Sequence, residues 1–386
     1  MRFRVAAILV LLCNLLPSFA GAQSAGCGKS AIEHELEIRP PNEEPTPHLS
    51  LADALDFLNV SSVSLAVIDR GELSLVCAFG REATVDTLYQ AASMSKLVTA
   101  VTALRLVEQG QLDLDRDIES ELRSWHLPAS DLTKGHPVTL RGLLSMTGGI
   151  GVPGFTGYEP GDILPGLNQI LDGAPPAHSP PVRVEYVPGS RYIYSGGGYE
   201  IVQALIQDAS GQGFAAAADA LVFRPAGMSR SLFAQPLPPD LMKGAAMGHH
   251  GDGDALPGGS RLIPELAAGG LWSTPSDLAH LLLDLAASYR GEAGHLISPA
   301  TAQAMFARQN GGPYGLGGAL GGAGKSLVLM KRGQNVGFQA YLLIFPETGQ
   351  GIVIMTDSDH GTTLAEALIR RAAAVYRWPA MGELAD

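Results

Sequence analysis

Short apolar runs near both ends of the chain predict β-strands. The first two span residues 61–69 and 73–79, and Arg70-Gly71-Glu72 between them is typical of a hairpin turn. Three further runs, separated by turn residues, lie toward the other end at 326–330, 338–345 and 351–356. We therefore expect one sheet assembled from strands of both termini.

Between these strands the apolar positions recur at helical spacing. A helix is predicted after Ser93, with apolar residues at 97, 98, 101, 104 and 106–107 and a stop at Gly110. Helical stretches such as 199–209 alternate with Gly/Pro loops at 151–160 and 173–181, and 362–376 is predicted as a closing helix. The pattern indicates an α/β fold with an inserted, mainly helical region, and a cleft where the two regions meet. The sheet region is expected at about 50–92 and 262–386, and the helical region at about 93–261.

The composition describes a globular chain with a sparsely charged surface. Of 386 residues, 46% are apolar and only 17% are charged, and the net charge is −12. An acidic chain without a basic run is a poor partner for nucleic acids or anionic membranes. The sequence has only six lysines, at positions 29, 96, 134, 243, 325 and 331. Each lysine is therefore worth considering as a functional group.

Residues 1–22 have the layout of a secretory signal. Arg2 and Arg4 precede an apolar run at 5–16, and Ala20-Gly21-Ala22 supplies small residues for cleavage. The run is too short to span a bilayer, so no transmembrane segment is expected in the mature chain. We expect a periplasmic or secreted bacterial protein in which an N-terminal segment, 23–49, precedes a hydrolase domain at 50–386.

The cysteines are too few for a disulfide framework or a metal cluster. Cys13 would leave with the signal, which leaves Cys27 and Cys77 either paired or unpaired. A lipid anchor at Cys27 is not expected, because the four residues that end there lack the apolar first position of a lipoprotein box. Neither HExxH nor a cysteine-rich spacing occurs in the sequence, so no metal or other cofactor is expected.

Ser93-Met94-Ser95-Lys96 is a candidate nucleophile motif. Three residues of helix advance about 300° and about 4.5 Å, so the Lys96 amine can reach the Ser93 hydroxyl. A nearby amine with a lowered pKa can accept the serine proton, and the start of a helix places the Ser93 N–H where an oxyanion would form. A solvated helix start is the alternative, but the apolar residues around the pair argue against a charged face.

Two further segments carry candidate groups. Tyr194 lies on a glycine-rich loop, where two ammonium groups would lower its pKa and let it shuttle a proton; a packed loop tyrosine is the alternative. Lys331-Arg332-Gly333 ends a strand pattern, so Lys331 could attract a substrate carboxylate, and Gly333 would let a substrate backbone come close. The N–H of Gln334 would be a second oxyanion donor. A basic turn between strands is the alternative for this segment.

Together the three motifs, in this order, resemble the serine β-lactamase and penicillin-binding-protein superfamily. The resemblance is to the branch of class C β-lactamases, D-alanyl-D-alanine carboxypeptidases and related esterases. It runs from about residue 61 to residue 356 and includes the segments 139–149, 225–228 and 269–278. The resemblance implies a β-lactamase-like α/β fold, in which helices flank an antiparallel sheet and a helical region is inserted.

The resemblance also implies roles for matching positions. Ser93 would be the nucleophile, Lys96 and Tyr194 would handle protons, and Lys331 would hold a substrate carboxylate. Either Lys96 or Tyr194 could be the general base, and the backbone N–H groups of Ser93 and Gln334 would form the oxyanion hole.

Two positions depart from the family pattern. Gly196 stands where an asparagine usually contacts the acyl side chain, and Arg332 replaces a small threonine. Both departures argue against strong β-lactam turnover.

We therefore expect a serine hydrolase that forms an acyl-enzyme at Ser93 and acts on a small-molecule amide or ester. A β-lactam or a D-amino-acid peptide is the leading substrate class. The alternatives are a carboxylesterase with negligible lactam turnover, and a penicillin-binding or sensing module that is acylated but barely deacylates. A monomer is expected.

Overall fold

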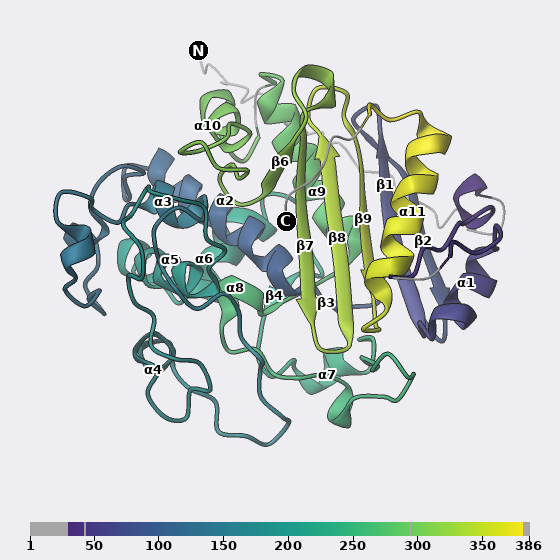
Figure 1. Cartoon of the computed structure of the whole chain (residues 1–386), viewed down its shortest axis with the longest axis horizontal. Helices are drawn as coiled ribbons and strands as arrows, with labels where there is room; N and C mark the ends of the chain where they lie inside the picture. The colour runs from purple at the N-terminus through teal and green to yellow at the C-terminus, as the bar shows by residue number, and fades with distance from the viewer. Residues whose placement is uncertain (1–29, 42–43, 293–294, 381–386) are drawn as a thin grey trace, which may run out of the picture.

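The centre of the protein is a six-stranded antiparallel sheet in the order β2-β1-β9-β8-β7-β6 (Figure 1). The computed structural model describes residues 30–41, 44–292 and 295–380. The N-terminal hairpin pairs directly with the last strand, so the predicted sheet built from both termini is confirmed. The predicted signal at 1–22 and Cys27 lie outside the described residues.

The strand bounds follow the apolar runs closely at most positions. The six strands of the large sheet are β1 Ser62–Asp69, β2 Glu72–Gly80, β6 Ala319–Gly321, β7 Val328–Asn335, β8 Phe338–Phe345 and β9 Gln350–Thr356. A small second sheet has the order β3-β5-β4, formed by β3 Tyr89–Gln90, β5 Leu271–Ser273 and β4 Leu232–Phe233.

The helices lie mainly between β3 and β6 in the sequence. They are α1 Leu51–Leu58, α2 Ser95–Glu108, α3 Leu140–Leu144, α4 Leu167–Asp172, α5 Gly196–Ser210, α6 Phe214–Ala218, α7 Pro239–Met242, α8 Leu266–Gly269, α9 Pro275–Tyr289, α10 Pro299–Met305 and α11 Gly361–Tyr376. A short 3-10 turn, η2 Ala92–Met94, directly precedes α2, and six further short helical turns connect other elements of the described chain. The predicted helices after Ser93, at 199–209 and at 362–376 are all present.

Strand β7 differs from its prediction because it continues past the apolar run. The pattern ends at Met330, but β7 pairs with β8 as far as Asn335. On its other edge, β6 pairs with β7 only from Val328 to Met330. Lys331 therefore lies within a strand, at the point where one edge of that strand loses its β-strand partner.

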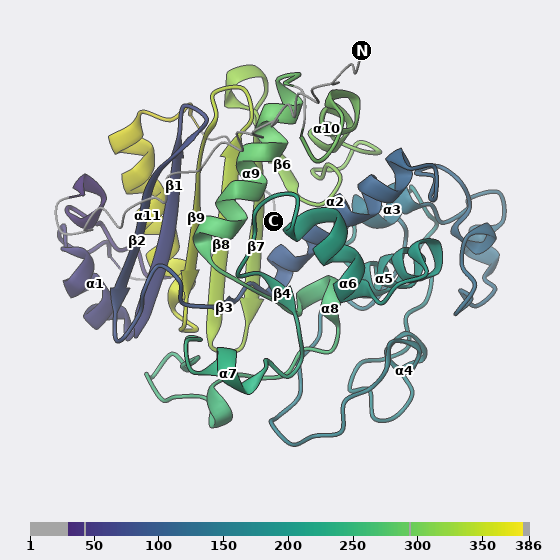
Figure 2. The ribbon, with the colours of Figure 1, turned by 180° about the vertical axis from the view of Figure 1, so that it is seen from behind.

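Helices cover both faces of the large sheet. Helix α11 lies on one face, in front of β8 and β9 in Figure 1, and α9 lies on the opposite face in Figure 2. Alternating residues of β1 pack into two separate apolar clusters: Leu65 and Val67 face α11, whereas Ala66 and Ile68 belong to the larger cluster on the α9 side. Burial of apolar surface, worth about 25 cal/mol per Å², holds the layers together.

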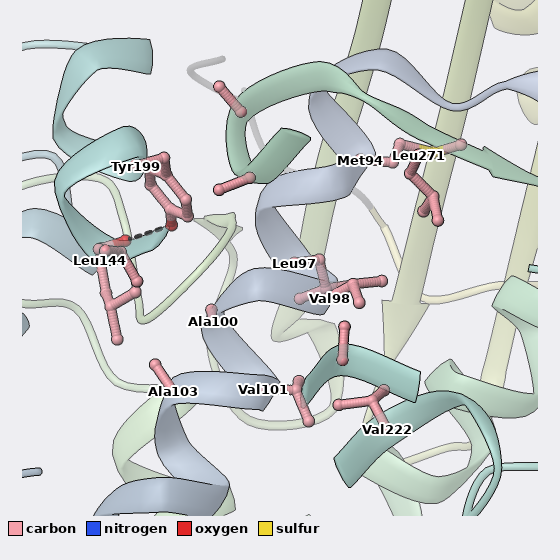
Figure 3. Close-up of a cluster of buried hydrophobic side chains, with 14 of the residues drawn as sticks. Met94, Leu97, Val98, Ala100, Val101, Ala103, Leu144, Tyr199, Val222 and Leu271 are labelled. Carbon is pink, nitrogen blue, oxygen red and sulfur yellow. Dashed lines mark hydrogen bonds between the residues drawn. The ribbon is translucent and has the colours of Figure 1, made fainter. Parts of the chain in front are cut away.

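Helix α2 runs through the middle of the helical region and is buried around most of its circumference. Leu97, Val98 and Val101 pack against neighbouring elements, as Figure 3 shows. In the same view the Tyr199 hydroxyl of α5 donates a 2.9 Å hydrogen bond to the Leu144 carbonyl. Such tight packing on all sides fixes the N-terminal end of α2, where Ser93 lies. In the part of the chain that the structure describes, no helix is long and apolar enough to cross a membrane.

Candidate active site

Ser93 lies on the tight turn η2 at the entrance to α2, and its side chain is half-buried. The preceding residue, Ala92, has a left-handed backbone with φ of 47°, a conformation that costs about 1 kcal/mol for a residue with a Cβ atom. The Ser95 hydroxyl stabilises this turn, since it donates to the Ala92 carbonyl and accepts from the N–H of Leu271 in β5. The turn presents Ser93 at the edge of the helical region.

Lys96 lies one turn along the helix and reaches back to Ser93. Its Nζ is 3.1 Å from Ser93 Oγ and 2.8 Å from the carbonyl oxygen of Ala268 in α8. The residue is only 2% exposed. Burial lowers the pKa of Lys96, and the charge of Lys331 lowers it further, while Tyr194 opposes both effects. This environment favours the neutral amine, the form that can accept a proton.

Tyr194 lies between the two lysines. Its ring centroid is 5.1 Å from Lys96 Nζ and 4.9 Å from Lys331 Nζ. The next residue, Ser195, caps α5: its hydroxyl accepts from the Gly198 N–H at 2.8 Å and donates to the Gly151 carbonyl at 2.7 Å. The cap fixes the backbone beside Tyr194, so the phenol ring has a defined position between the two ammonium groups.

Lys331 enters the site from the middle of β7. Its Nζ is 3.0 Å from the hydroxyl of Tyr314, and the residue is 1% exposed. Tyr314 is also fully buried and lies in the loop before β6. Sequence reasoning missed this tyrosine because it lies in a glycine-rich stretch without helical or strand periodicity.

These side chains meet at a cavity of about 290 Å³. Its lining includes three basic residues, several apolar residues and no carboxylate: Ser93, Lys96, Pro153, Gly154, Phe155, Tyr194, Ile263, Ala268, Gly269, Lys331, Arg332, Gln334 and Asn335. Six of the predicted site residues are therefore brought together. Gly196 and Gly333 are not part of the lining.

Arg332 lines the cavity, but its guanidinium turns toward the sheet. The guanidinium carbon is 5.4 Å from the ring centroid of Tyr341, the residue directly opposite on β8. Neighbouring residues of a strand point to opposite faces, so Arg332 and Lys331 diverge. The bulk of Arg332 is thereby partly directed away from the Ser93 side of β7.

The two glycines have packing reasons of their own. A Cβ atom on Gly333 would lie 2.2 Å from the Ala91 carbonyl oxygen, so this glycine lets β7 approach η2. A Cβ atom on Gly196 would lie 3.0 Å from Cε2 of Phe155. The Phe155 ring thus lies against the position where the family pattern has an asparagine side chain.

Two buried glutamates behind Lys96 were also missed. Glu200 of α5 accepts a 3.0 Å hydrogen bond from the Ala268 N–H. Burial raises the pKa of Glu200 well above its usual value, and burial raises the pKa of Glu265 to about 7. An acid within the apolar run 199–206 is a sequence signal for Glu200, but no spacing links it to Ser93. Within the described ranges no group of three or more His, Cys, Asp or Glu side chains could hold a metal ion.

Comparison with known proteins places the chain in an enzyme family. The Beta-lactamase family matches residues 51–377. Esterase EstB of Burkholderia gladioli is 32% identical over 157 residues, which are 39% of each chain. The D-alanyl-D-alanine-carboxypeptidase/endopeptidase AmpH of Escherichia coli K12 is 24% identical over 292 residues, 71% of this chain and 72% of AmpH. The match to EstB thus spans well under half of that relative's length.

Solved structures share the fold. The D-amino acid amidase from Ochrobactrum anthropi SV3 superposes with a TM-score of 0.67 and 23% identity, covering 85% of this chain and 97% of the amidase. The octameric penicillin-binding protein homologue from Pyrococcus abyssi gives a TM-score of 0.67 and 22% identity, covering 84% of this chain and 76% of that one. The predicted resemblance and the predicted fold are confirmed. The chain belongs to the Beta-lactamase family of serine hydrolases.

Proposed function

We propose that the protein hydrolyses a small amide or ester through an acyl-enzyme at Ser93. The main support is the 3.1 Å contact between Lys96 Nζ and Ser93 Oγ, combined with the burial of Lys96. The neutral amine accepts the hydroxyl proton while Ser93 Oγ bonds to the substrate carbonyl carbon. The tetrahedral intermediate then expels the leaving group, which takes up a proton, and water later cleaves the acyl-serine bond to release the acid.

Tyr194 and Lys331 complete the proposed chemistry. The Tyr194 side chain hydrogen-bonds to the Lys96 amine, so a proton can pass within this pair and either member can be the general base. Lys331 places a positive charge on the cavity wall, where it attracts a substrate carboxylate. The N–H groups of Ser93 and Gln334 are the proposed oxyanion donors.

The leading substrates are β-lactams and D-amino-acid peptides. The positive charge of Lys331 and the absence of a carboxylate among the lining residues favour an acidic substrate. Relatives include a D-alanyl-D-alanine-carboxypeptidase/endopeptidase and a D-amino acid amidase, and both act on amides. We also propose that the protein works in the bacterial periplasm or outside the cell, without a cofactor.

Intact-protein mass spectrometry tests the nucleophile. After incubation with a penicillin or an activated ester, the native protein should gain the mass of one acyl group, with the adduct mapped to Ser93. Ser93→Ala should gain none and lose at least about a thousandfold in turnover. Ser190→Ala, at an exposed serine four residues before Tyr194, is the control and should react like the native protein. Full activity in Ser93→Ala would contradict the proposal.

A carboxylesterase is a second candidate, favoured by the Phe155 ring that packs against Gly196. An apolar ring offers no amide to an acylamino side chain, which suits an ester with an apolar acyl group. Comparing the hydrolysis of nitrocefin and p-nitrophenyl butyrate separates the two functions, since appreciable nitrocefin turnover excludes a pure esterase. A module that is acylated but barely deacylates would instead show a stoichiometric burst without multiple turnovers on either substrate.

A further inference from the structure

Helix α8 lies between α2 and α5 and binds side chains of α2 through its carbonyl groups. The Ala268 carbonyl accepts the 2.8 Å hydrogen bond from Lys96 Nζ, and the Ala267 carbonyl accepts a 3.0 Å bond from the Thr99 hydroxyl. Both donors belong to α2. The position of the Lys96 amine therefore depends on where α8 holds its carbonyl oxygens.

Side chains of α5 hold the opposite side of the same segment. Helix α8 has only four residues, and the N–H groups of Ala267 and Ala268 lie in its first turn, where no carbonyl of the helix can accept them. Gln203 Oε1 accepts from the Ala267 N–H and Glu200 Oε1 accepts from the Ala268 N–H, each at 3.0 Å. Ala268 is thus bound to Glu200 through its N–H and to Lys96 through its carbonyl.

Glu200 is suited to this contact as a neutral acceptor. The residue is 0% exposed, and its second oxygen, Oε2, has no hydrogen-bond partner within the described part of the chain. Burial, reinforced by the nearby Glu265, raises the pKa of Glu200 and so favours the protonated carboxyl. A neutral carboxyl keeps negative charge away from Lys96, where it would raise the lysine pKa.

We propose that Glu200 is a positioning residue, which fixes Ala268 and, through the Ala268 carbonyl, holds Lys96 Nζ within reach of Ser93 Oγ. This inference rests on the proposed acylation of Ser93. Glu200 does not line the cavity, so its effect on the substrate passes through Ala268 and Lys96, which do.

Two substitutions at Glu200 test the inference. Glu200→Gln keeps an uncharged acceptor of the same length and should acylate within about threefold of the native rate. Glu200→Leu removes the acceptor and should lower kcat and the acylation rate by roughly ten- to a hundredfold with KM nearly unchanged. The acid limb of its pH–rate profile should also lie at a lower pH than in the native enzyme. A Lys96 ammonium that loses its bond to the Ala268 carbonyl is less stable, so the Lys96 pKa falls.

Gln203→Leu is the matched control. It removes the same kind of bond one turn along α5, but the N–H that loses its acceptor belongs to Ala267, whose carbonyl binds Thr99 and not Lys96. We expect a comparable loss of thermal stability with an unchanged pH profile. The peptide group between Ala267 and Ala268 is held by Glu200 at its N–H and by the Thr99 hydroxyl at its carbonyl. Thr99→Val removes the second of these bonds and should slow acylation by about two- to fivefold.

The outcomes separate this inference from the proposed function. A native protein that forms no adduct at Ser93 contradicts both. A native protein that acylates normally, together with a folded Glu200→Leu of native rate and pH profile, contradicts the inference alone. So does a Glu200→Gln as slow as Glu200→Leu. If Glu200→Leu does not fold, Glu200→Met, which keeps the length but offers no oxygen acceptor, takes its place, and a native rate and pH profile in that variant overturn the inference.

Discussion

The two site lysines influence each other across the ring of Tyr194. Each ammonium lies about 5 Å from that ring, and both lysines are buried. The charge of Lys331 therefore acts on Lys96 through a medium that screens poorly. Besides the substrate attraction proposed for it, Lys331 therefore lowers the pKa of Lys96 and makes that amine easier to deprotonate.

Lys331→Met should move the acid limb of the rate profile to higher pH. Removal of that positive charge takes away one cause of the lowered Lys96 pKa, so the neutral amine forms only at higher pH. We expect kcat/KM to fall by roughly tenfold or more, because substrate attraction is lost as well. The pH dependence of kcat/KM for an uncharged ester measures the shift separately from carboxylate binding. Lys325→Met, on a turn outside the cavity lining, is the control and should leave the profile in place.

Glu265 predicts a pH dependence of stability. Its pKa is about 7 in the folded protein against 4.5 in the unfolded chain, so between these values the folded state binds the extra proton. Stability should therefore be highest below pH 4.5 for this group and should fall by about 3 kcal/mol as the pH rises through 7. Glu265→Gln removes the carboxyl and with it this pH dependence. At pH 8 the variant buries no charged carboxylate at this position, so its free energy of unfolding should exceed that of the native protein.

Urea unfolding at pH 5 and pH 8 measures this difference. Glu347→Gln removes the same charge from an exposed position and is the control. Equal pH slopes for Glu265→Gln and the native protein would show that the Glu265 carboxyl does not titrate in this window.

Site residues that are related by a regular interval along the chain can be predicted from the sequence. Site residues that meet only through the tertiary fold cannot. The three-residue interval from Ser93 to Lys96 is close to one helical turn, so the interval alone places both side chains on the same side of a helix. Tyr314 contacts Lys331 across an irregular loop, and Glu200 reaches Lys96 only through Ala268, which lies 172 residues from Lys96 in the sequence. No local pattern encodes such a meeting, so the sequence does not point to these two groups.

At the scale of elements, the decisive contact is between β7 and η2. Strand β8 was predicted with its observed bounds because it is buried along its whole length and reads as one apolar run. The end of β7 does not follow from the pattern. Lys331 and Gly333 interrupt the apolar run, whereas the backbone of β7 continues to pair with β8 as far as Asn335. An apolar run therefore predicts a strand that is buried along its length. It does not predict the part of a strand in which polar residues or glycine replace the apolar ones.

Gly333→Ala should push β7 away from η2. Its new methyl group would lie 2.2 Å from the Ala91 carbonyl oxygen, a backbone atom that cannot rotate aside. We expect a loss of about 2 kcal/mol in stability and at least about a tenfold fall in kcat, because Gln334 moves relative to Ser93. Thermal melting and ester hydrolysis measure the two effects. Gly324→Ala is the control for steric clash, because no atom lies within 4 Å of the new Cβ atom at that position. Its φ of 55° adds local backbone strain but should leave kcat unchanged.

At the scale of the molecule, we predict a monomer whose hydrolase domain spans residues 50–386. The cavity described above is formed within one chain, which is the observation behind this prediction. The homologue from Pyrococcus abyssi is octameric, which makes assembly a property to be measured for this chain. Light scattering after size exclusion should give the mass of one chain, with activity per chain independent of concentration. A stable oligomer would contradict the prediction.

The pairing of β1 with β9 has a consequence for how the protein is made. Val63 is opposite Thr356 in that ladder, so the first strand of the large sheet pairs with the last strand of the same sheet. A nascent chain can form the β1–β2 hairpin, but the sheet and the site lack Lys331 and β9 until residues 331 and 350–356 have been synthesised. The complete site therefore arises only after the strand that ends at Thr356 has been made. An early stop codon or a proteolytic loss of the last strands would remove the hydrolase activity together with the fold.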